Sequence, residues 1–236
     1  MIIAANLKTN LTRKETKNYV DELSSFIEKN RITQEVLVFP AMSSLDDYNS
    51  VVTVGAQNAY PTKDGAFTGE IGTLHLDEFS INTILIGHSE RRHILGETQE
   101  EIIKKFDFYK ALGFKIVYCI GEPLEKREAG KEQMMEYISS QYEGIDTGYK
   151  NLIIAYEPVW AIGTGLTPTL DDIETIHTDL KEKSKAPLLY GGSVKVTNAK
   201  EVLALNNVDG ILVGSAALYA EHFCSMISFA QNLDKN

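Results

Sequence analysis

The stretch that decides the fold is LIIAYEPVWAIGTG, residues 152–165. Its first five residues form a continuous apolar run, which is typical of a parallel strand covered on both faces. A carboxylate, Glu157, follows directly, and then come a proline-aromatic segment and two glycines around a threonine. This order predicts a buried strand that ends at an acid and leads into a loop whose backbone N–H groups can hold an anion. Taken alone, the same letters also fit an ordinary strand and turn.

Similar apolar runs recur along the chain at the spacing of a βα unit, roughly thirty residues. The eight predicted strands are residues 2–7, 36–39, 51–56, 81–86, 114–120, 152–156, 187–190 and 210–213. Amphipathic, charged segments lie between them and predict helices, most clearly at 14–29, 98–112, 170–183 and about 216–233. We expect Thr169 to cap the third of these helices and Gly113 to follow the end of the second.

Eight strands alternating with helices fit either a (β/α)₈ barrel or a long doubly wound sheet. No Gly-x-Gly-x-x-Gly follows the first strand, which counts against a dinucleotide-binding fold. No linker or low-complexity segment divides the 236 residues. The sequence therefore predicts one α/β domain over residues 1–236, a (β/α)₈ barrel.

Composition excludes several classes of function. The net charge of −10 disfavours nucleic-acid binding and means that an anionic ligand needs local positive groups. No run of eighteen apolar residues predicts a membrane span, and the first residues do not resemble a signal peptide. The two cysteines, Cys119 and Cys224, lie far apart and fit a reducing compartment, so we expect a cytoplasmic protein.

The residues at the predicted strand ends suit proton movement next to a carbonyl group. Active groups of such barrels lie at the carboxyl ends of the strands. Asn6 and Lys8 are two residues apart and should face the same side. Glu157 could take a proton from carbon, His88 could donate a hydrogen bond to the carbonyl oxygen, and Asn6 and Lys8 could stabilise an enediolate. We interpret Cys119 as a buried packing residue.

The same end of the barrel has features of a phosphate site. Glycine-containing turns follow the seventh and eighth strands, where barrel enzymes often bind phosphate. Residues 158–168 contain no lysine or arginine, so Lys8 is expected to be the single fixed cation. The N–H groups expected to hold the phosphate are those of Gly163, Ser193, Gly214 and Ser215.

Each of these residues, taken singly, also fits an ordinary structural role, and their placement at one end of the barrel is what favours a site. We predict no metal, because His88 and His93 are five apart and no metal-binding spacing is present. Proton movement next to the carbonyl of a phosphorylated compound fits an isomerase, and two alternatives to it remain. One is a metal-dependent sugar-phosphate epimerase on a similar barrel, and the other is a barrel that binds a phosphometabolite without catalysis.

Eight short motifs resemble the triosephosphate isomerase family, in the family's order, from the first strand to the last helix. They are NLK (6–8), GAQN (55–58), GAFTGE (65–70), GHSERR (87–92), CIGE (119–122), AYEPVWAIGTG (155–165), YGGSV (190–194) and GILVG (210–214). The resemblance implies a TIM barrel that interconverts dihydroxyacetone phosphate and glyceraldehyde 3-phosphate without a cofactor, in glycolysis and gluconeogenesis. It assigns Glu157 as the base, His88 as a neutral electrophile, and Asn6 and Lys8 as substrate-binding residues.

The resemblance also implies a homodimer formed through the loop at residues 60–69. Thr68, near the tip of that loop, would reach the partner's site close to Asn6 and Glu90. Three departures from the family stand out: Leu7 replaces a tryptophan, Ser215 replaces a glycine, and Pro168 ends the segment that the family uses as a lid. Because proline fixes φ, we expect the distal hinge of this lid to be stiffer than usual.

Overall fold

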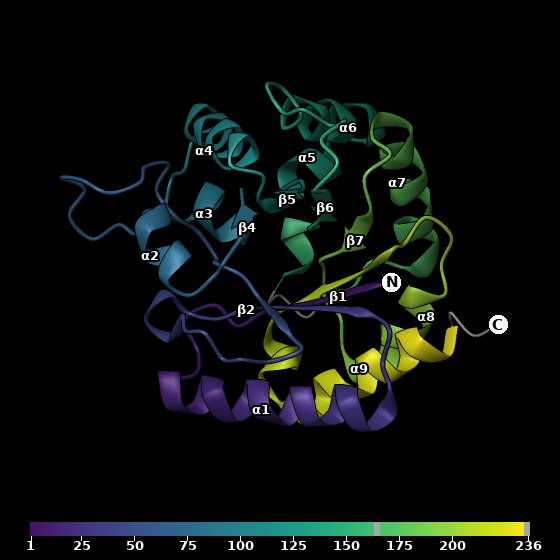
Figure 1. The fold of residues 1–236 in the computed structure, drawn as a ribbon. Coiled ribbons are helices and arrows are strands. Elements are labelled where there is room, and N and C mark those ends of the chain that lie inside the picture. Colours follow the sequence, from purple (N-terminus) through teal and green to yellow (C-terminus); the bar gives the residue numbers. More distant parts are fainter. Residues whose placement is uncertain (163–165, 234–236) are drawn as a thin grey trace.

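Eight short parallel strands curve into a barrel in the computed structural model, which describes residues 1–162 and 166–233 (Figure 1). They are β1 Ile2–Asn6, β2 Glu35–Phe39, β3 Thr53–Val54, β4 Thr83–Ile86, β5 Lys115–Ile120, β6 Leu152–Tyr156, β7 Leu188–Tyr190 and β8 Gly210–Val213. The order of paired strands is β3-β2-β1-β8-β7-β6-β5-β4, and a parallel bridge between Ala56 and Ile84 joins its two ends. The predicted (β/α)₈ barrel is confirmed, and the doubly wound alternative is wrong.

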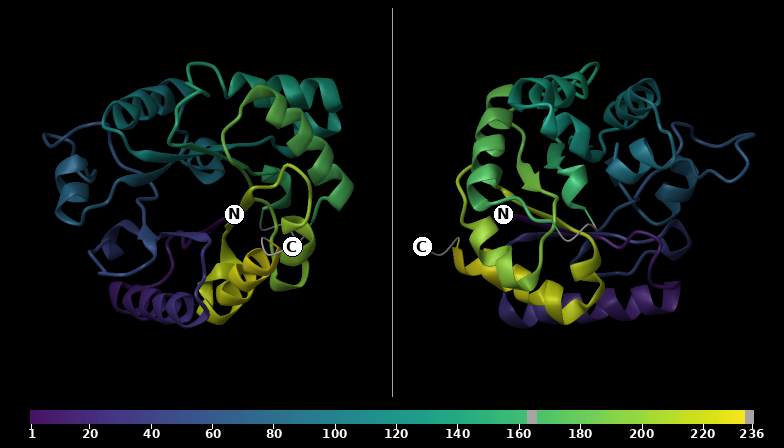
Figure 2. Two further views of the ribbon diagram at one scale, coloured as in Figure 1. Left: turned by 45° about the vertical axis from the view of Figure 1, so that its right-hand side comes forward. Right: turned by 180° about the vertical axis from the view of Figure 1, so that it is seen from behind.

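Helices surround the barrel on its outside, as the views in Figure 2 show. They are α1 Arg13–Asn30, α2 Thr73–Glu78, α3 Ser89–His93, α4 Gln99–Ala111, α5 Leu124–Glu128, α6 Lys131–Ser140, α7 Leu170–Lys183, α8 Val196–Leu203 and α9 Ala220–Leu233. Thr169 caps α7 as predicted, since its hydroxyl accepts a hydrogen bond from the N–H of Asp172 at 3.1 Å. Gly113 follows the end of α4 with φ +80°, a conformation that favours glycine.

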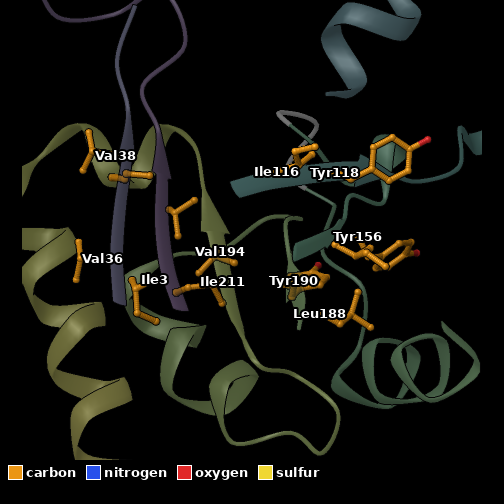
Figure 3. Close-up of a cluster of buried hydrophobic side chains, with 14 of the residues drawn as sticks. Ile3, Val36, Val38, Ile116, Tyr118, Tyr156, Leu188, Tyr190, Val194 and Ile211 are labelled. Carbon is orange, nitrogen blue, oxygen red and sulfur yellow. The ribbon is translucent and has the colours of Figure 1, made fainter. Parts of the chain in front are cut away.

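The strands separate two apolar layers because successive side chains point to opposite faces. One layer fills the barrel interior with small and medium side chains such as Ala4, Cys119 and Ala155. The other layer lies between strands and helices, and Figure 3 shows part of it, including Ile3, Tyr118 and other alternating residues of the same strands. This alternation decides which side chains at the strand ends face the barrel axis.

Two predicted boundaries are wrong. The third strand was expected over 51–56, but β3 has only two residues, because the chain leaves the ladder before the bridge at Ala56. The last helix was expected from about residue 216, but a short 3₁₀ helix, Ser215–Leu218, comes first and α9 begins at Ala220. Across the described part of the chain, no helix has the length and apolar character needed to span a bilayer.

Candidate active site

Glu157 lies immediately after β6, at the carboxyl end of the barrel, and its side chain is buried. Its backbone N–H donates to the carbonyl of Ile120 at 2.7 Å, which continues the pairing of β5 and β6 by one residue. Its Oε2 accepts a hydrogen bond from the Ser89 N–H at 3.0 Å. Neighbouring glycines make room for it, since a Cβ at Gly191 would lie 2.9 Å from the Glu157 Cγ.

His88 faces this carboxylate from the end of β4. Its Nε2 lies 3.0 Å from the Oε1 of Glu157, and its Nδ1 accepts the N–H of Glu90 at 3.2 Å. A ring nitrogen that accepts a backbone N–H carries no proton itself, so the Nε2 carries it and donates to Glu157. The structure thus orients the imidazole with an N–H pointing at the site.

The two groups shift each other's pKa. Burial raises the pKa of Glu157, but the facing His88, the Ser89 N–H and the charge of Lys8 lower it by more, so the net pKa is below the usual range. Burial lowers the pKa of His88, and the facing charge and hydrogen bond of Glu157 raise it by more. The carboxylate is therefore ionised at neutral pH, and the raised pKa of the imidazole depends on the carboxylate facing it.

Asn6 and Lys8 lie beside these residues at the end of β1. Lys8 has φ +52°, and its N–H donates to the Oδ1 of Asn6 at 3.1 Å. Its ammonium forms an ion pair with Glu90 at 2.5 Å. Leu7, between them, is fully buried in the layer between strands and helices. The predicted opposite orientation of Leu7 is confirmed, and its replacement of the family's tryptophan therefore falls outside the cavity.

A cavity of about 390 Å³ brings most of the predicted site residues together. Its lining includes Asn6, Lys8, His88, Glu157, Ser193, Gly214 and Ser215. Lys8 is close to the turn after β8, since a Cβ at Gly214 would lie 3.8 Å from its Nζ. Gly163, also predicted, is outside the residues that the structure describes.

Glu90 and Thr68 do not line this cavity. Glu90 borders an adjoining cavity of about 420 Å³, which also contacts Asn6, Lys8 and His88. Thr68 is exposed on the loop that projects next to α2 in Figure 1, and it lines neither cavity. Exposed apolar side chains, those of Ile94 and Leu95, also line the second cavity.

Sequence reasoning missed Lys195, which also lines the first cavity. The expectation that Lys8 is the single fixed cation there is therefore wrong. The signal was present in the sequence, because Lys195 stands two residues after Ser193, within the turn that follows β7.

Sequence reasoning also missed a buried carboxylate that holds the start of segment 158–168. The Oε1 of Glu122 accepts hydrogen bonds from the Trp160 indole at 2.8 Å and from the Tyr156 hydroxyl at 3.1 Å. Burial raises the pKa of Glu122, and these donors offset part of that rise. The guanidinium of Arg127 lies 4.5 Å from the centre of the Trp160 ring and 2.8 Å from Asp172 on α7.

The cysteines are inert packing residues in this arrangement. Cys119 is fully buried in the barrel interior, where burial raises the pKa of its thiol, and Cys224 is buried on α9; both are free thiols. Within residues 1–162 and 166–233, no three His, Cys, Asp or Glu side chains are grouped so that they could hold a metal ion.

The cavity can support proton transfer at carbon beside a carbonyl group. It brings one ionised carboxylate, one imidazole N–H, one side-chain amide and two lysines, Lys8 and Lys195, around a single space. Backbone N–H groups of the turns after β7 and β8 border the same space and can donate to phosphate oxygens. A small phosphorylated carbonyl compound would fit both the proton-transfer groups and the turns that border this cavity.

Comparison with known proteins agrees with this chemistry. The family model described as "Triosephosphate isomerase" matches residues 1–230. A triosephosphate isomerase of Sulfurimonas denitrificans is 70% identical over 235 residues, which cover 100% of this chain and 98% of that protein. The triosephosphate isomerase of a Sulfurovum species is 56% identical over 96% of this chain and 99% of its own length. That of Helicobacter hepaticus is 49% identical over 96% of this chain and 97% of its own length.

Proposed function

Because the chain belongs to the triosephosphate isomerase family, we propose that it interconverts dihydroxyacetone phosphate and glyceraldehyde 3-phosphate. Membership of this family of aldose–ketose isomerases favours that reaction over the epimerase and the non-catalytic barrel. The observation that carries the proposal for the site is the contact of 3.0 Å between Glu157 and His88 inside the cavity bordered by the turns after β7 and β8. This activity would serve glycolysis and gluconeogenesis. The two free thiols support a cytoplasmic location.

In the proposed reaction, Glu157 removes a proton from the carbon next to the carbonyl, and the electron pair of that C–H bond forms the double bond of an enediolate. Glu157 then returns the proton to the former carbonyl carbon, while the hydroxyl proton on the first carbon's oxygen passes to the former carbonyl oxygen, so that the new carbonyl forms. To reach the substrate, the carboxylate must turn away from His88 and Ser89, which it contacts in this structure. His88 then loses the contact that raises its pKa, while burial continues to lower that pKa. It therefore acts as a neutral imidazole that donates its Nε2–H to the substrate oxygen.

The remaining residues stabilise negative charge. Lys8 and Asn6 lie next to His88 and are proposed to interact with the oxygens of the enediolate. The phosphate is proposed to bind the N–H groups of Ser193, Gly214 and Ser215, together with that of Gly163. Preorganised donors of this kind contribute about 3 kcal/mol each to transition-state stabilisation. The scheme requires no metal and no cofactor.

We also propose that the active form is a homodimer. Ile94 and Leu95, which line the second cavity, are 75% and 66% exposed. Phe67, on the projecting loop, is 41% exposed. The edge of the second cavity and the tip of the loop therefore both expose apolar side chains. Insertion of the partner's Phe67–Thr68 tip into the second cavity would cover these side chains and bring Thr68 close to Asn6 and Glu90, which line that cavity. Sedimentation equilibrium tests this, and a mass of one 26.3 kDa chain at micromolar concentration would contradict it.

The test of the proposed base is Glu157→Gln, with Glu182→Gln on the exposed part of α7 as the matched control. The first variant should lose about 10²- to 10⁴-fold in turnover, because the amide cannot accept the proton. It should also stop exchange of the substrate's carbon-bound proton with solvent, whereas binding of inorganic phosphate should persist. Full activity of Glu157→Gln, or an equal loss in the control, would overturn the assignment.

A further inference from the structure

Lys195 is a second cation on the wall of the candidate active site. It lies at the end of the turn after β7, directly before α8, and it borders the same cavity as Lys8, Glu157 and Ser193. Its side chain is exposed, and among the described residues no carboxylate forms an ion pair with it. Its charge is therefore available to a ligand that enters the cavity.

The other charged groups around the cavity leave an excess of negative charge that Lys195 can offset. Lys8, the other ammonium group, is already paired with Glu90, and the second carboxylate, Glu157, lies inside the cavity. Without Lys195, the carboxylates of Glu157 inside the cavity and of Glu90 in the adjoining cavity would therefore outnumber the single ammonium of Lys8 where a phosphate of charge about −2 has to bind. The net charge of −10 on the whole chain adds long-range repulsion.

The backbone at this position is held independently of the lysine side chain. The N–H of Lys195 donates to the Oδ1 of Asn198 at 2.8 Å, and the Nδ2 of Asn198 donates to the carbonyl of Ser193 at 3.1 Å. The side-chain amide of Asn198 thus closes the turn by binding backbone atoms of Lys195 and Ser193. Replacement of the Lys195 side chain leaves both hydrogen bonds in place.

We propose that Lys195 captures the dianionic phosphate of the substrate, offsetting the negative charge of the protein at the mouth of the cavity. This inference rests on the proposed function for its substrate and adds an electrostatic residue to it. An exposed ammonium acts through charge at a distance, so it should accelerate association and strengthen binding without changing the proton-transfer steps. Its effect should appear in kcat/KM and in phosphate affinity, with kcat unchanged.

The test compares Lys195→Gln and Lys195→Glu with the matched pair Lys200→Gln and Lys200→Glu. Lys200 is exposed on α8, the helix that Lys195 precedes, and it does not line the cavity, so its variants change the net charge equally. At low ionic strength, Lys195→Gln should lower kcat/KM about threefold and Lys195→Glu about tenfold. Both deficits should disappear at about 0.5 M salt, and the Lys200 variants should change kcat/KM by much less.

Titration with inorganic phosphate, followed by the NMR signals of Ser193 and Gly214, gives a readout that does not need catalysis. Lys195→Gln should weaken phosphate binding by the same factor as it lowers kcat/KM. If the wild type binds phosphate in this way but does not isomerise triose phosphates, the proposed function fails and the role of Lys195 stands. Equal effects at 195 and 200, a deficit that persists in high salt, or a fall in kcat would each overturn the role of Lys195.

Discussion

His177 allows a quantitative prediction about stability, because it is a fully buried histidine that lines neither cavity of the candidate site. It lies on α7 against the outer side of β6 and β7, with its ring centre 5.9 Å from that of Tyr156 and 6.1 Å from that of Tyr190. Its Nδ1 donates to the carbonyl of Asn207 at 3.0 Å, and in the described part of the chain its Nε2 has no hydrogen-bond partner. Burial lowers the pKa of His177 to about 4, so the folded protein keeps it neutral.

The sign and size of the pH effect follow from that shift. In the unfolded chain the pKa of His177 returns to about 6.5. Between the two pKa values, the unfolded state therefore binds a proton that the folded state does not bind. The stability is therefore fully present above about pH 6.5 and is lost as pH falls toward the folded pKa. Between about pH 7.5 and pH 5.5 the loss is about 1.3 kcal/mol. Since this window ends well above the folded pKa, the number depends almost entirely on the unfolded value.

Urea denaturation of the wild type and of His177→Gln at both pH values measures this term. The glutamine variant is expected to be less stable at each pH, because it packs differently, but its loss between the two pH values should be about 1.3 kcal/mol smaller. His222→Gln is the control, because His222 is exposed on α9. Protein concentration must be equal throughout, since the stability of the proposed dimer would depend on it. An identical pH dependence for His177→Gln and the wild type would refute the reasoning.

Two further predictions concern segment 158–168. Arg127→Met should lower the free energy of unfolding by about 1 kcal/mol, because it removes the stacking on Trp160 and a half-exposed ion pair with Asp172; an unchanged urea midpoint would count against both contacts. Pro168→Ala should raise the NMR relaxation dispersion of the residues around position 168, because alanine frees the φ angle that proline fixes. Identical dispersion profiles would mean that the proline does not stiffen the hinge.

The sequence predicts the architecture well because the signals that decide it are local. Short apolar runs, most of them continuous, indicate all eight strands, and the capping residue Thr169 indicates the start of α7. The two boundary errors arise where local pattern and tertiary geometry differ. Residues near β3 are apolar enough to extend the strand, but closure of the barrel leaves only Thr53 and Val54 in the ladder. After β8, the chain makes a 3₁₀ turn at Ser215 before it can continue as α9.

The candidate site was predictable to the extent that its residues follow strands directly. Asn6 and Glu157 continue the alternation of their strands, so their positions at the cavity follow from residue counting. The contribution of Lys195 could not be found in this way, because it lies in a turn where no alternation applies. The adjoining cavity could not be predicted either, since its walls come from four separate segments of the chain.

The same alternation that packs the barrel interior also creates the cavity. The inner layer ends with Ala155 on β6 and Leu189 on β7, and the next inward positions are Glu157 and Gly191. These two residues follow the paired residues Tyr156 and Tyr190, and Gly191 donates its N–H to the Tyr156 carbonyl at 2.7 Å. One further apolar side chain at position 191 would close the barrel over the carboxylate, because even a Cβ there lies 2.9 Å from the Glu157 Cγ. The candidate site therefore lies where the sequence places a glycine beside a buried carboxylate, and the absence of a side chain at position 191 leaves space next to that carboxylate.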